Sequence, residues 1–315
     1  MKILVAIDGS EHSEAALDEI THRHSPPGSE VRVISVVNPP MPLAEESLAT
    51  SAGYHGELEK MEREQARRAI EKAAGRLRDS LDGDSVKITT EVLSGSAKQV
   101  ILEEAEAFGA DLIVVGSHGH GALERFLLGS VSQAVALHAK CSVEIVRSRK
   151  SGLEMMRILI AIDGSEHSEA AVDEIAHWHY QADSEVRVIS VSEPPYFPTT
   201  YPGEGVDMNL YGQMEKYARE VALAAVDKAA AKLRASEDIR QLNVTTEVLS
   251  GSPKEVILEE AEAFGAGLIV VGSHGYGMLE RFLLGSVSQA VALHATCSVE
   301  IVRTPKTQTS ESAYQ

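Results

Sequence analysis

Two glycine-rich segments contain the residues of this sequence that are best suited to bind a ligand. Both have the spacing Gly-x2-Gly-x9-Gly-Ser, one starting at Gly116 and the other at Gly272. At the start of a helix, unpaired main-chain N–H groups attract a phosphate, and a serine there can add a hydroxyl group. Glycine lets a ligand approach the main chain because it has no Cβ atom. The spacing therefore predicts two phosphate sites; the alternative is that the glycines only end a strand and begin a helix.

The two segments belong to a duplication that covers most of the chain. Residues 116–139 and 272–295 differ at only two positions, and ILVAIDGSEHSEAALDEI at Ile3 returns as ILIAIDGSEHSEAAVDEI at Ile158. A period this long indicates a whole domain used twice rather than a solenoid repeat. We predict a first domain over residues 1–149, a linker over 150–156, a second domain over 157–304 and a polar tail over 305–315.

Each copy alternates between strand-like and helix-like segments. Short runs rich in Ile and Val, such as KILVAID and DLIVVGS, are typical of buried strands. In the first copy we expect strands at 2–8, 30–37, 86–93, 111–117 and 141–147, and helices at 10–24, 57–80, 97–108 and 130–139. Ser10 or Asp8 is expected to cap the first helix, and Ser130 the last one. The alternation predicts a doubly wound α/β domain, formed twice, with helices on both faces of a parallel sheet.

The position of the glycines excludes two common nucleotide-binding motifs. Gly116 follows the fourth predicted strand, and Gly129 stands before the last helix. Neither copy contains Gly-x4-Gly-Lys-Ser/Thr, so the sequence has no lysine of the kind that meets a γ-phosphate in NTPases with that loop. The glycines also lack the Gly-x-Gly-x-x-Gly spacing of dinucleotide-binding domains, where they follow the first strand.

Composition and charge narrow the class of protein. A hydrophobic content of 43% and a charged content of 24% are typical of a globular protein, and no apolar run is long enough to span a bilayer. The segment MKILVAIDGS predicts a strand rather than a signal peptide. The net charge of −18 disfavours nucleic acid and membrane surfaces as partners. Cys141 and Cys297 are expected to be reduced core residues of a cytoplasmic protein.

Taken together, the motifs resemble the universal stress protein family. The two spaced signatures match the nucleotide-binding signature of that family, and ILVAIDGSEHSEAA resembles its opening strand and helix. The resemblance covers nearly all of both copies. It implies five parallel strands per domain in the order 3-2-1-4-5, with an adenine nucleotide in the crevice where the winding direction reverses.

The resemblance also implies the site residues. Ala6 and Asp8 are expected beside the adenosine, with the helix cap as a competing role for Asp8, and Val36 or Val37 is expected to offer main-chain groups to adenine. The expected ribose and phosphate contacts of the first copy are Gly116, His118, Gly119, Gly129, Ser130 and Val131. The second copy supplies Ala161, Asp163, Val191, Gly272, His274, Gly275, Gly285, Ser286 and Val287. The implied ligand is ATP, ADP or AMP, with or without Mg²⁺, and we assign no catalytic or metal-ligating residue.

Two classes of function fit these residues. The first is a stress-response regulatory protein with one adenine-nucleotide site per domain and an unknown protein partner. The second is a slow ATPase or phosphotransferase, which the missing lysine and the lack of clustered carboxylates in the motif disfavour. Related domains pair through the fifth strand, so we expect the two domains to pair within the chain, with a homodimer as a further arrangement. Glu144 in that strand departs from the apolar residues that the resemblance implies, and its carboxylate is an argument against the usual packing there.

The two copies differ most in the segments after the second strand. These are Asn38 to Gly56 and Glu193 to Gly212, which we predict to be long loops at the carboxyl edge of the sheet. The second contains more Tyr and Pro than the first. We expect the loops to act as unequal lids that give the two sites different affinities; the alternative is a pair of exposed variable loops.

Overall fold

Strands and helices alternate along the chain, and the same series of elements occurs twice. The computed structural model describes residues 1–22, 28–38, 48–81, 86–119, 128–148, 156–178, 180, 183–194, 208–237, 239, 242–275 and 284–304. Domain 1 contains β1 (Lys2–Ala6), α1 (Glu11–His22), β2 (Glu30–Val37), α2 (Leu48–Ser80), β3 (Lys87–Ser94), α3 (Ala97–Phe108), β4 (Leu112–Gly116), α4 (Ser130–His138) and β5 (Ser142–Val146). Domain 2 contains β6 (Arg157–Ala161), α5 (Glu166–Ala176), β7 (Glu185–Ser192), α6 (Met208–Ala235), β8 (Asn243–Ser250), α7 (Pro253–Phe264), β9 (Leu268–Gly272), α8 (Ser286–His294) and β10 (Ser298–Val302).

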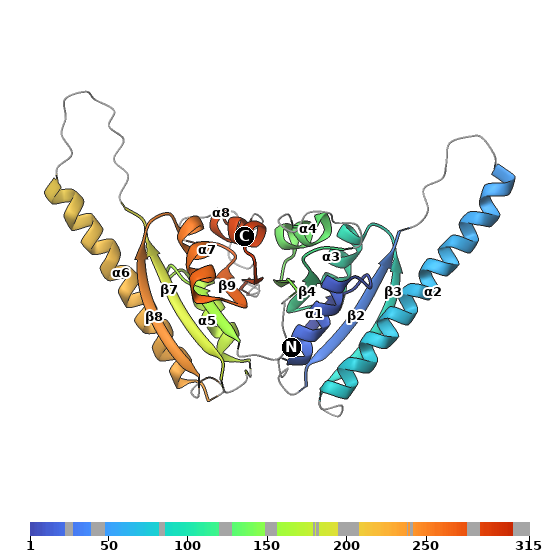
Figure 1. Cartoon of the computed structure of the whole chain (residues 1–315), viewed down its shortest axis with the longest axis horizontal. Helices are drawn as coiled ribbons and strands as arrows, with labels where there is room; N and C mark the ends of the chain where they lie inside the picture. Colours follow the sequence, from blue (N-terminus) through green and yellow to red (C-terminus); the bar gives the residue numbers. More distant parts are fainter. Residues whose placement is uncertain are drawn as a thin grey trace, which may run out of the picture.

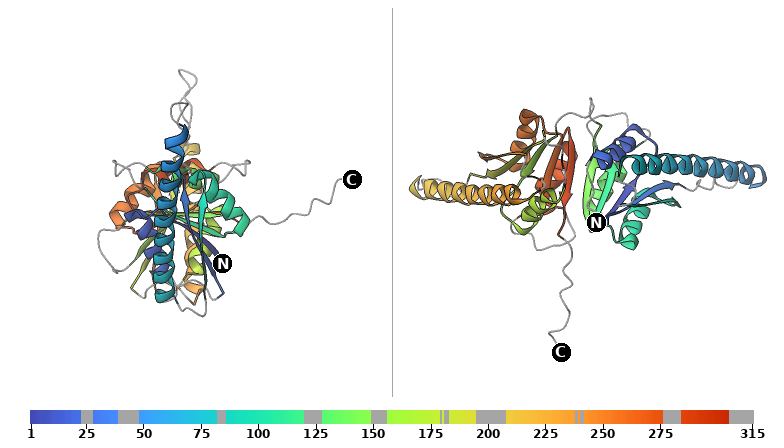
Figure 2. Two further views of the ribbon diagram at one scale, coloured as in Figure 1. Left: turned by 90° about the vertical axis from the view of Figure 1, so that its right-hand side faces the viewer. Right: turned by 90° about the horizontal axis from the view of Figure 1, so that it is seen from below.

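Both domains contribute five parallel strands to one continuous sheet. The strand order is β3-β2-β1-β4-β5-β10-β9-β6-β7-β8, which confirms the predicted order 3-2-1-4-5 in each domain. The domains meet where β5 and β10 pair in antiparallel orientation, with Val143 opposite Ile301 and Ile145 opposite Val299. Figure 2 shows this junction from below, with the two domains on either side of it. The fifth strands therefore join the two domains within one chain.

Helices cover both faces of the sheet, and the alternation of side chains along each strand builds a core on each face. In β1, for example, Ile3 packs against α1 and α2, whereas Leu4 packs on the opposite face with α3 and α4. The core under α3 and α4 continues across the junction into that under α7 and α8. On the other face, Trp178 follows α5 but packs within the core of domain 1, where only 1% of its surface is exposed. The two domains thus share buried contacts on both faces.

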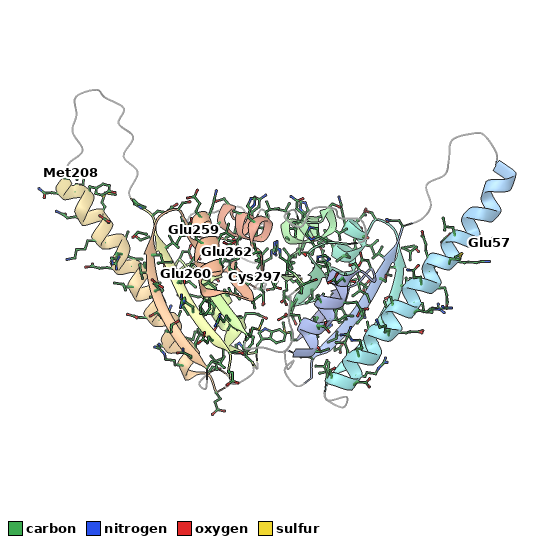
Figure 3. All side chains as sticks on the ribbon, in the orientation of Figure 1. Glu57, Met208, Glu259, Glu260, Glu262 and Cys297 are labelled. Atoms are coloured by element: carbon green, nitrogen blue, oxygen red, sulfur yellow. The ribbon has the colours of Figure 1, made fainter. Side chains whose placement is uncertain are left out.

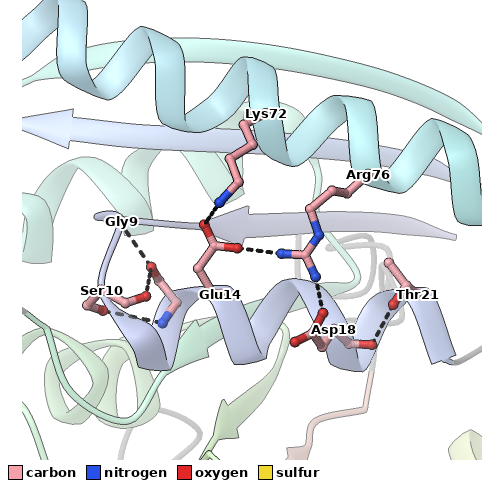
Figure 4. Close-up of polar contacts among 8 residues, drawn as sticks. Gly9, Ser10, Glu14, Asp18, Thr21, Lys72 and Arg76 are labelled. Carbon is pink, nitrogen blue, oxygen red and sulfur yellow. Dashed lines mark hydrogen bonds and ion pairs between the residues drawn. The ribbon is translucent and has the colours of Figure 1, made fainter. Parts of the chain in front are cut away.

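The long helices α2 and α6 form the outer flanks of the molecule (Figure 1). In domain 1, Lys72 Nζ lies 3.1 Å from Glu14 Oε1, and Arg76 contacts both Glu14 and Asp18, so α2 is held against α1 (Figure 4). Lys228 and Lys232 of α6 make the corresponding ion pairs with α5. Within the described parts of the chain, no helix is both long and apolar enough to cross a bilayer.

Helix α2 is longer than predicted. It begins at Leu48 instead of Glu57, so the second part of the predicted loop is helical, and in domain 2 the helix begins at Met208. The prediction was wrong here because glycine and serine lower helix propensity, but that cost is small for the extension of a helix that has already formed. Residues 39–47 and 195–207, on which the lid hypothesis depends, lie outside the described residues, as do the predicted tail and residues 150–155 of the linker.

Candidate functional site

A cavity opens in each domain where the first and fourth strands of that domain end side by side. Cavity 1 has a volume of about 730 Å³ and is lined by all ten residues predicted for domain 1, from Ala6 to Val131. Cavity 2 has a volume of about 380 Å³ and is lined by all nine residues predicted for domain 2, from Ala161 to Val287. Both volumes lie in the range of small-molecule sites. The structure thus brings the predicted residues together in two groups, at the point where the winding direction of each sheet reverses.

The N-terminus of α4 forms one wall of cavity 1. The N-cap is Gly129, whose extended backbone has φ −61° and ψ 148°, and Ser130 is already helical. The prediction that Ser130 caps this helix was therefore wrong, and α8 begins in the same way after Gly285. The N–H group of Gly129 donates to Ser117 O at 2.8 Å. Helix geometry leaves the next N–H groups without intrahelical acceptors, so they are available to an anion in the cavity.

The glycines of the motif are also required by close contacts within the protein. A Cβ atom on Gly116 would lie 2.7 Å from the carbonyl carbon of His12, and one on Gly119 would lie 2.5 Å from Asp8 Oδ2. A Cβ atom on Gly129 would lie 3.0 Å from Ser117 O. These contacts explain the glycines without any ligand. The features that point to a ligand are therefore the cavity and the helix N-terminus, not the glycines.

Asp8 and Ser10 both act at the start of α1. Asp8 Oδ1 accepts the N–H group of Ser10 at 2.9 Å, and Ser10 Oγ accepts the N–H group of Ser13 at 3.3 Å. Ser10 is thus the cap and Asp8 fixes the turn before it; Asp163 and Ser165 repeat the arrangement in domain 2. The carboxylate of Asp8 is exposed and lines cavity 1, so the turn and a ligand can share it.

His118 lies against a second histidine that sequence reasoning missed. The ring centroids of His12 and His118 are 5.1 Å apart, and those of His167 and His274 are also 5.1 Å apart. Burial lowers the pKa of His12, and the neighbouring His118 lowers this pKa further. A histidine recurs at the second position of both opening helices, and this recurrence is the sequence signal by which the pair could have been found.

Backbone alternation distinguishes Val36 from Val37. Val37 O accepts the N–H group of Gly95 at 3.0 Å, so this carbonyl belongs to the pairing with β3. Ile34 O faces the other way and accepts the N–H group of Ile7 at 2.9 Å. Because successive residues of a strand direct their main-chain groups to opposite sides, Val36 faces the side on which β1 has ended. In domain 2, Ser192 O accepts the N–H group of Gly251 at 3.1 Å, so the main-chain groups of Ser192 face β8. Val191 therefore has the same orientation as Val36 in domain 1.

The two cavities differ in the helix that follows the second strand. Glu62, Gln65, Ala66 and Ala69 of α2 line cavity 1, and sequence reasoning missed them because their segment showed only a long amphipathic helix. The residues of α6 that correspond to Glu62 and Gln65 are the apolar Ala218 and Val221. Among the described residues that line either cavity, none is Lys or Arg, whereas Asp8, Glu62, Asp163 and Glu193 are acidic. An anionic group in these cavities would therefore be met by main-chain N–H groups.

The fold and the two cavities define a class of protein with tandem doubly wound domains and a crevice at each switch point. A sequence profile described as the universal stress protein family matches residues 1–147 and 155–303, and the chain belongs to this family. It is 31% identical over 310 residues to a universal stress protein of Mycolicibacterium smegmatis, with 96% of each chain covered. It is also 28% identical over 316 residues to one of Mycobacterium tuberculosis, with 93% of each covered. A universal stress protein structure from Archaeoglobus fulgidus shares the fold, with a TM-score of 0.59, 21% identity and 97% of each chain covered.

Proposed function

We propose that the protein is a stress-response regulatory protein that binds one adenine nucleotide in each domain. The observation that carries this proposal is that the first turn of α4 and Val36 at the end of β2 line the same cavity. The first turn offers N–H groups to phosphates. The main chain of Val36 offers an acceptor and a donor, which match the amino group and ring nitrogens of adenine.

The charge around the cavities bears on the form in which the nucleotide binds. Asp8 and Glu62 line cavity 1, and no Lys or Arg stands among its described lining residues. A polyphosphate is therefore expected to bind together with Mg²⁺, which proteins commonly hold through one or two carboxylates and the phosphates themselves. Asp8 and Asp163 are the carboxylates that fit this role in the two domains.

We further propose that nucleotide occupancy, rather than turnover, is the signal. A bound nucleotide that contacts α4, β1 and β2 at once favours the conformation in which these elements are closest to one another, and a protein partner can read that conformation. The family to which the chain belongs supports a role in stress responses.

The test is to identify what the purified protein carries. The chain is purified without added nucleotide, denatured, and the released small molecules are separated by chromatography and identified by mass spectrometry. We expect adenine nucleotide, with a total of about two per chain after titration with MgATP. A protein that releases no nucleotide and binds none in calorimetry would contradict the proposal.

A further inference from the structure

Two arginines reach across the junction between the domains. Arg147 directly follows β5 of domain 1, yet its guanidinium donates to two carbonyl oxygens of domain 2, Ala292 O at 2.7 Å and Cys297 O at 3.0 Å. Arg303 directly follows β10 and makes the reciprocal contacts, with Ala136 O at 2.6 Å and Cys141 O at 3.2 Å. Figure 3 labels Cys297 near the middle of the molecule, where the domains meet.

One of the two carbonyl groups that each arginine contacts lies in the last turn of a helix that starts at a cavity, Ala292 in α8 and Ala136 in α4. Ala292 is in the last turn of α8, where carbonyl groups have no intrahelical donor. A guanidinium there satisfies such a carbonyl and carries the charge that a helix C-terminus favours. The opposite end of the same helix, at Ser286 and Val287, lines cavity 2. Because α8 has nine residues, its two ends are about 13 Å apart.

The arginines are fixed by more than their guanidinium groups. The N–H group of Arg147 donates to Ser298 Oγ at 3.1 Å, and that of Arg303 donates to Ser142 Oγ at 3.1 Å. Both side chains are half-buried. Burial lowers the pKa of Arg303 to about 10, so its guanidinium is still charged at neutral pH. Helices α4 and α8 also contact each other across the junction. Each helix therefore begins at the cavity of its own domain and ends at an arginine from the other domain.

We propose that Arg147 and Arg303 are positioning residues that act crosswise: Arg147 of domain 1 sets the position of α8 and hence the nucleotide affinity of cavity 2, while Arg303 of domain 2 does the same for α4 and cavity 1. This inference rests on the proposed nucleotide binding. It links each site to the integrity of the junction, since separation of β5 from β10 would withdraw both arginines.

The test compares the two sites in backgrounds that keep only one of them. In the Gly129→Val background only cavity 2 is expected to bind nucleotide, and in the Gly285→Val background only cavity 1. Arg147→Met is added to each background. We expect the Kd for MgATP to rise about three- to tenfold at cavity 2, the size of coupling that packed elements transmit, and to stay within about twofold at cavity 1. Arg303→Met should give the opposite pattern, and Arg147→Lys should restore part of the affinity.

Arg234→Met is the matched control, because Arg234 also donates to a main-chain carbonyl, Val244 O at 2.8 Å, but does so within domain 2 and away from α8. It should leave both affinities unchanged. An equal loss at both sites in Arg147→Met, or a loss only at cavity 1, would overturn the crosswise assignment while nucleotide binding itself stands.

Amide hydrogen exchange without nucleotide gives an independent readout. Arg147→Met should speed exchange in the first turns of α8 but not of α4, and Arg303→Met should do the reverse. If the single-site proteins bind no nucleotide, the proposed function fails, and this exchange pattern still decides whether the arginines hold the helices crosswise. Equal exchange in both helices would contradict it.

Discussion

Glu144 lies directly opposite Glu300 in the antiparallel pair that joins the two domains, and neither side chain has any exposed surface. The carboxylate of Glu144 was an argument against the usual packing of this strand, but β5 and β10 do pair, as the prediction of paired domains required. The residues on either side of the glutamates explain why. Val143, Ile145, Val299 and Ile301 are completely buried there, and such apolar burial contributes roughly 1.5–3 kcal/mol per side chain.

The opposed glutamates lead to a prediction about stability. Two carboxyl groups at directly opposed buried positions repel each other when both are ionised, whereas two amides can hydrogen-bond, so the double variant Glu144→Gln, Glu300→Gln should raise the free energy of unfolding by about 1–3 kcal/mol at pH 7. Urea denaturation measures this change. Glu262→Gln, at an exposed position of α7, serves as the control and should have almost no effect. A double variant that is less stable than the parent would show that the carboxylates support the junction.

A second prediction concerns the number of sites. Gly129→Val and Gly285→Val should each lower the calorimetric stoichiometry for MgATP from about two to about one. A Cβ atom at Gly129 would already lie 3.0 Å from Ser117 O and 3.3 Å from the Cα atom of His118, so a branched side chain must displace either this loop or the start of α4, both of which line the cavity.

Gly75→Ala is the control for the glycine variants. Gly75 lies inside α2, and a Cβ atom there would meet nothing within 4 Å. This variant should keep both sites and be more stable by about 0.5–1 kcal/mol, because alanine favours the helix. Two full sites in both valine variants would refute the assignment of the helix N-termini as the phosphate-binding ends.

A third prediction is that ATP turnover is slow or absent. None of the described residues that line either cavity is Lys or Arg, so no cationic side chain is available there to stabilise the charge that develops on a transferring phosphoryl group. We therefore expect a steady-state ATPase rate below ~1 s⁻¹, the lower end of usual enzyme rates. A faster rate that disappears in the double variant Asp8→Asn, Asp163→Asn would instead assign catalysis to these carboxylates.

The fourth prediction concerns the pH dependence of a thiol. Both cysteines are free, as expected, and burial raises the pKa of Cys141 from 9.0 to about 11, although the nearby charge of Arg303 opposes this rise. Because the thiolate is the reactive form, Cys141 should react with iodoacetamide at pH 8.5 at least ~tenfold more slowly in the native protein than in urea. Peptide mapping by mass spectrometry measures both rates, and equal rates would contradict the burial argument.

The raised pKa of Cys141 also makes the stability of the native state depend on pH. A thiol whose pKa is higher in the native state binds its proton more tightly there, so the native state is favoured below the unfolded value. This contribution should be lost as the pH rises from about 9 to about 11. Thermal unfolding of Cys141→Ser should show a weaker pH dependence than the parent in this range.

The sequence by itself determined the repeated order of strands and helices. It also determined which residues follow the strands at the carboxyl edge of the sheet. Runs such as Leu112–Gly116 are short, apolar, rich in Ile and Val and end at glycine, which favours a buried strand over a buried helix, and the segment Glu11–His22 has the periodicity of a helix with one buried face. These signals are local, because each depends on whether neighbouring side chains face the core. They were sufficient to place the glycines and Asp8 beside one another once the strand order of the resembling family was assumed.

Only the tertiary structure decided which atoms meet across long stretches of the chain. His12 beside His118, Trp178 in the core of domain 1 and Arg147 at the end of α8 each bring together residues that no periodicity relates. The helix start at Leu48 was also decided in three dimensions, because extension of a formed helix outweighs the weak propensity of its first residues. The spacing of apolar residues indicates that a side chain is buried. The strand order and the pairing of β5 with β10 determine which residues it packs against.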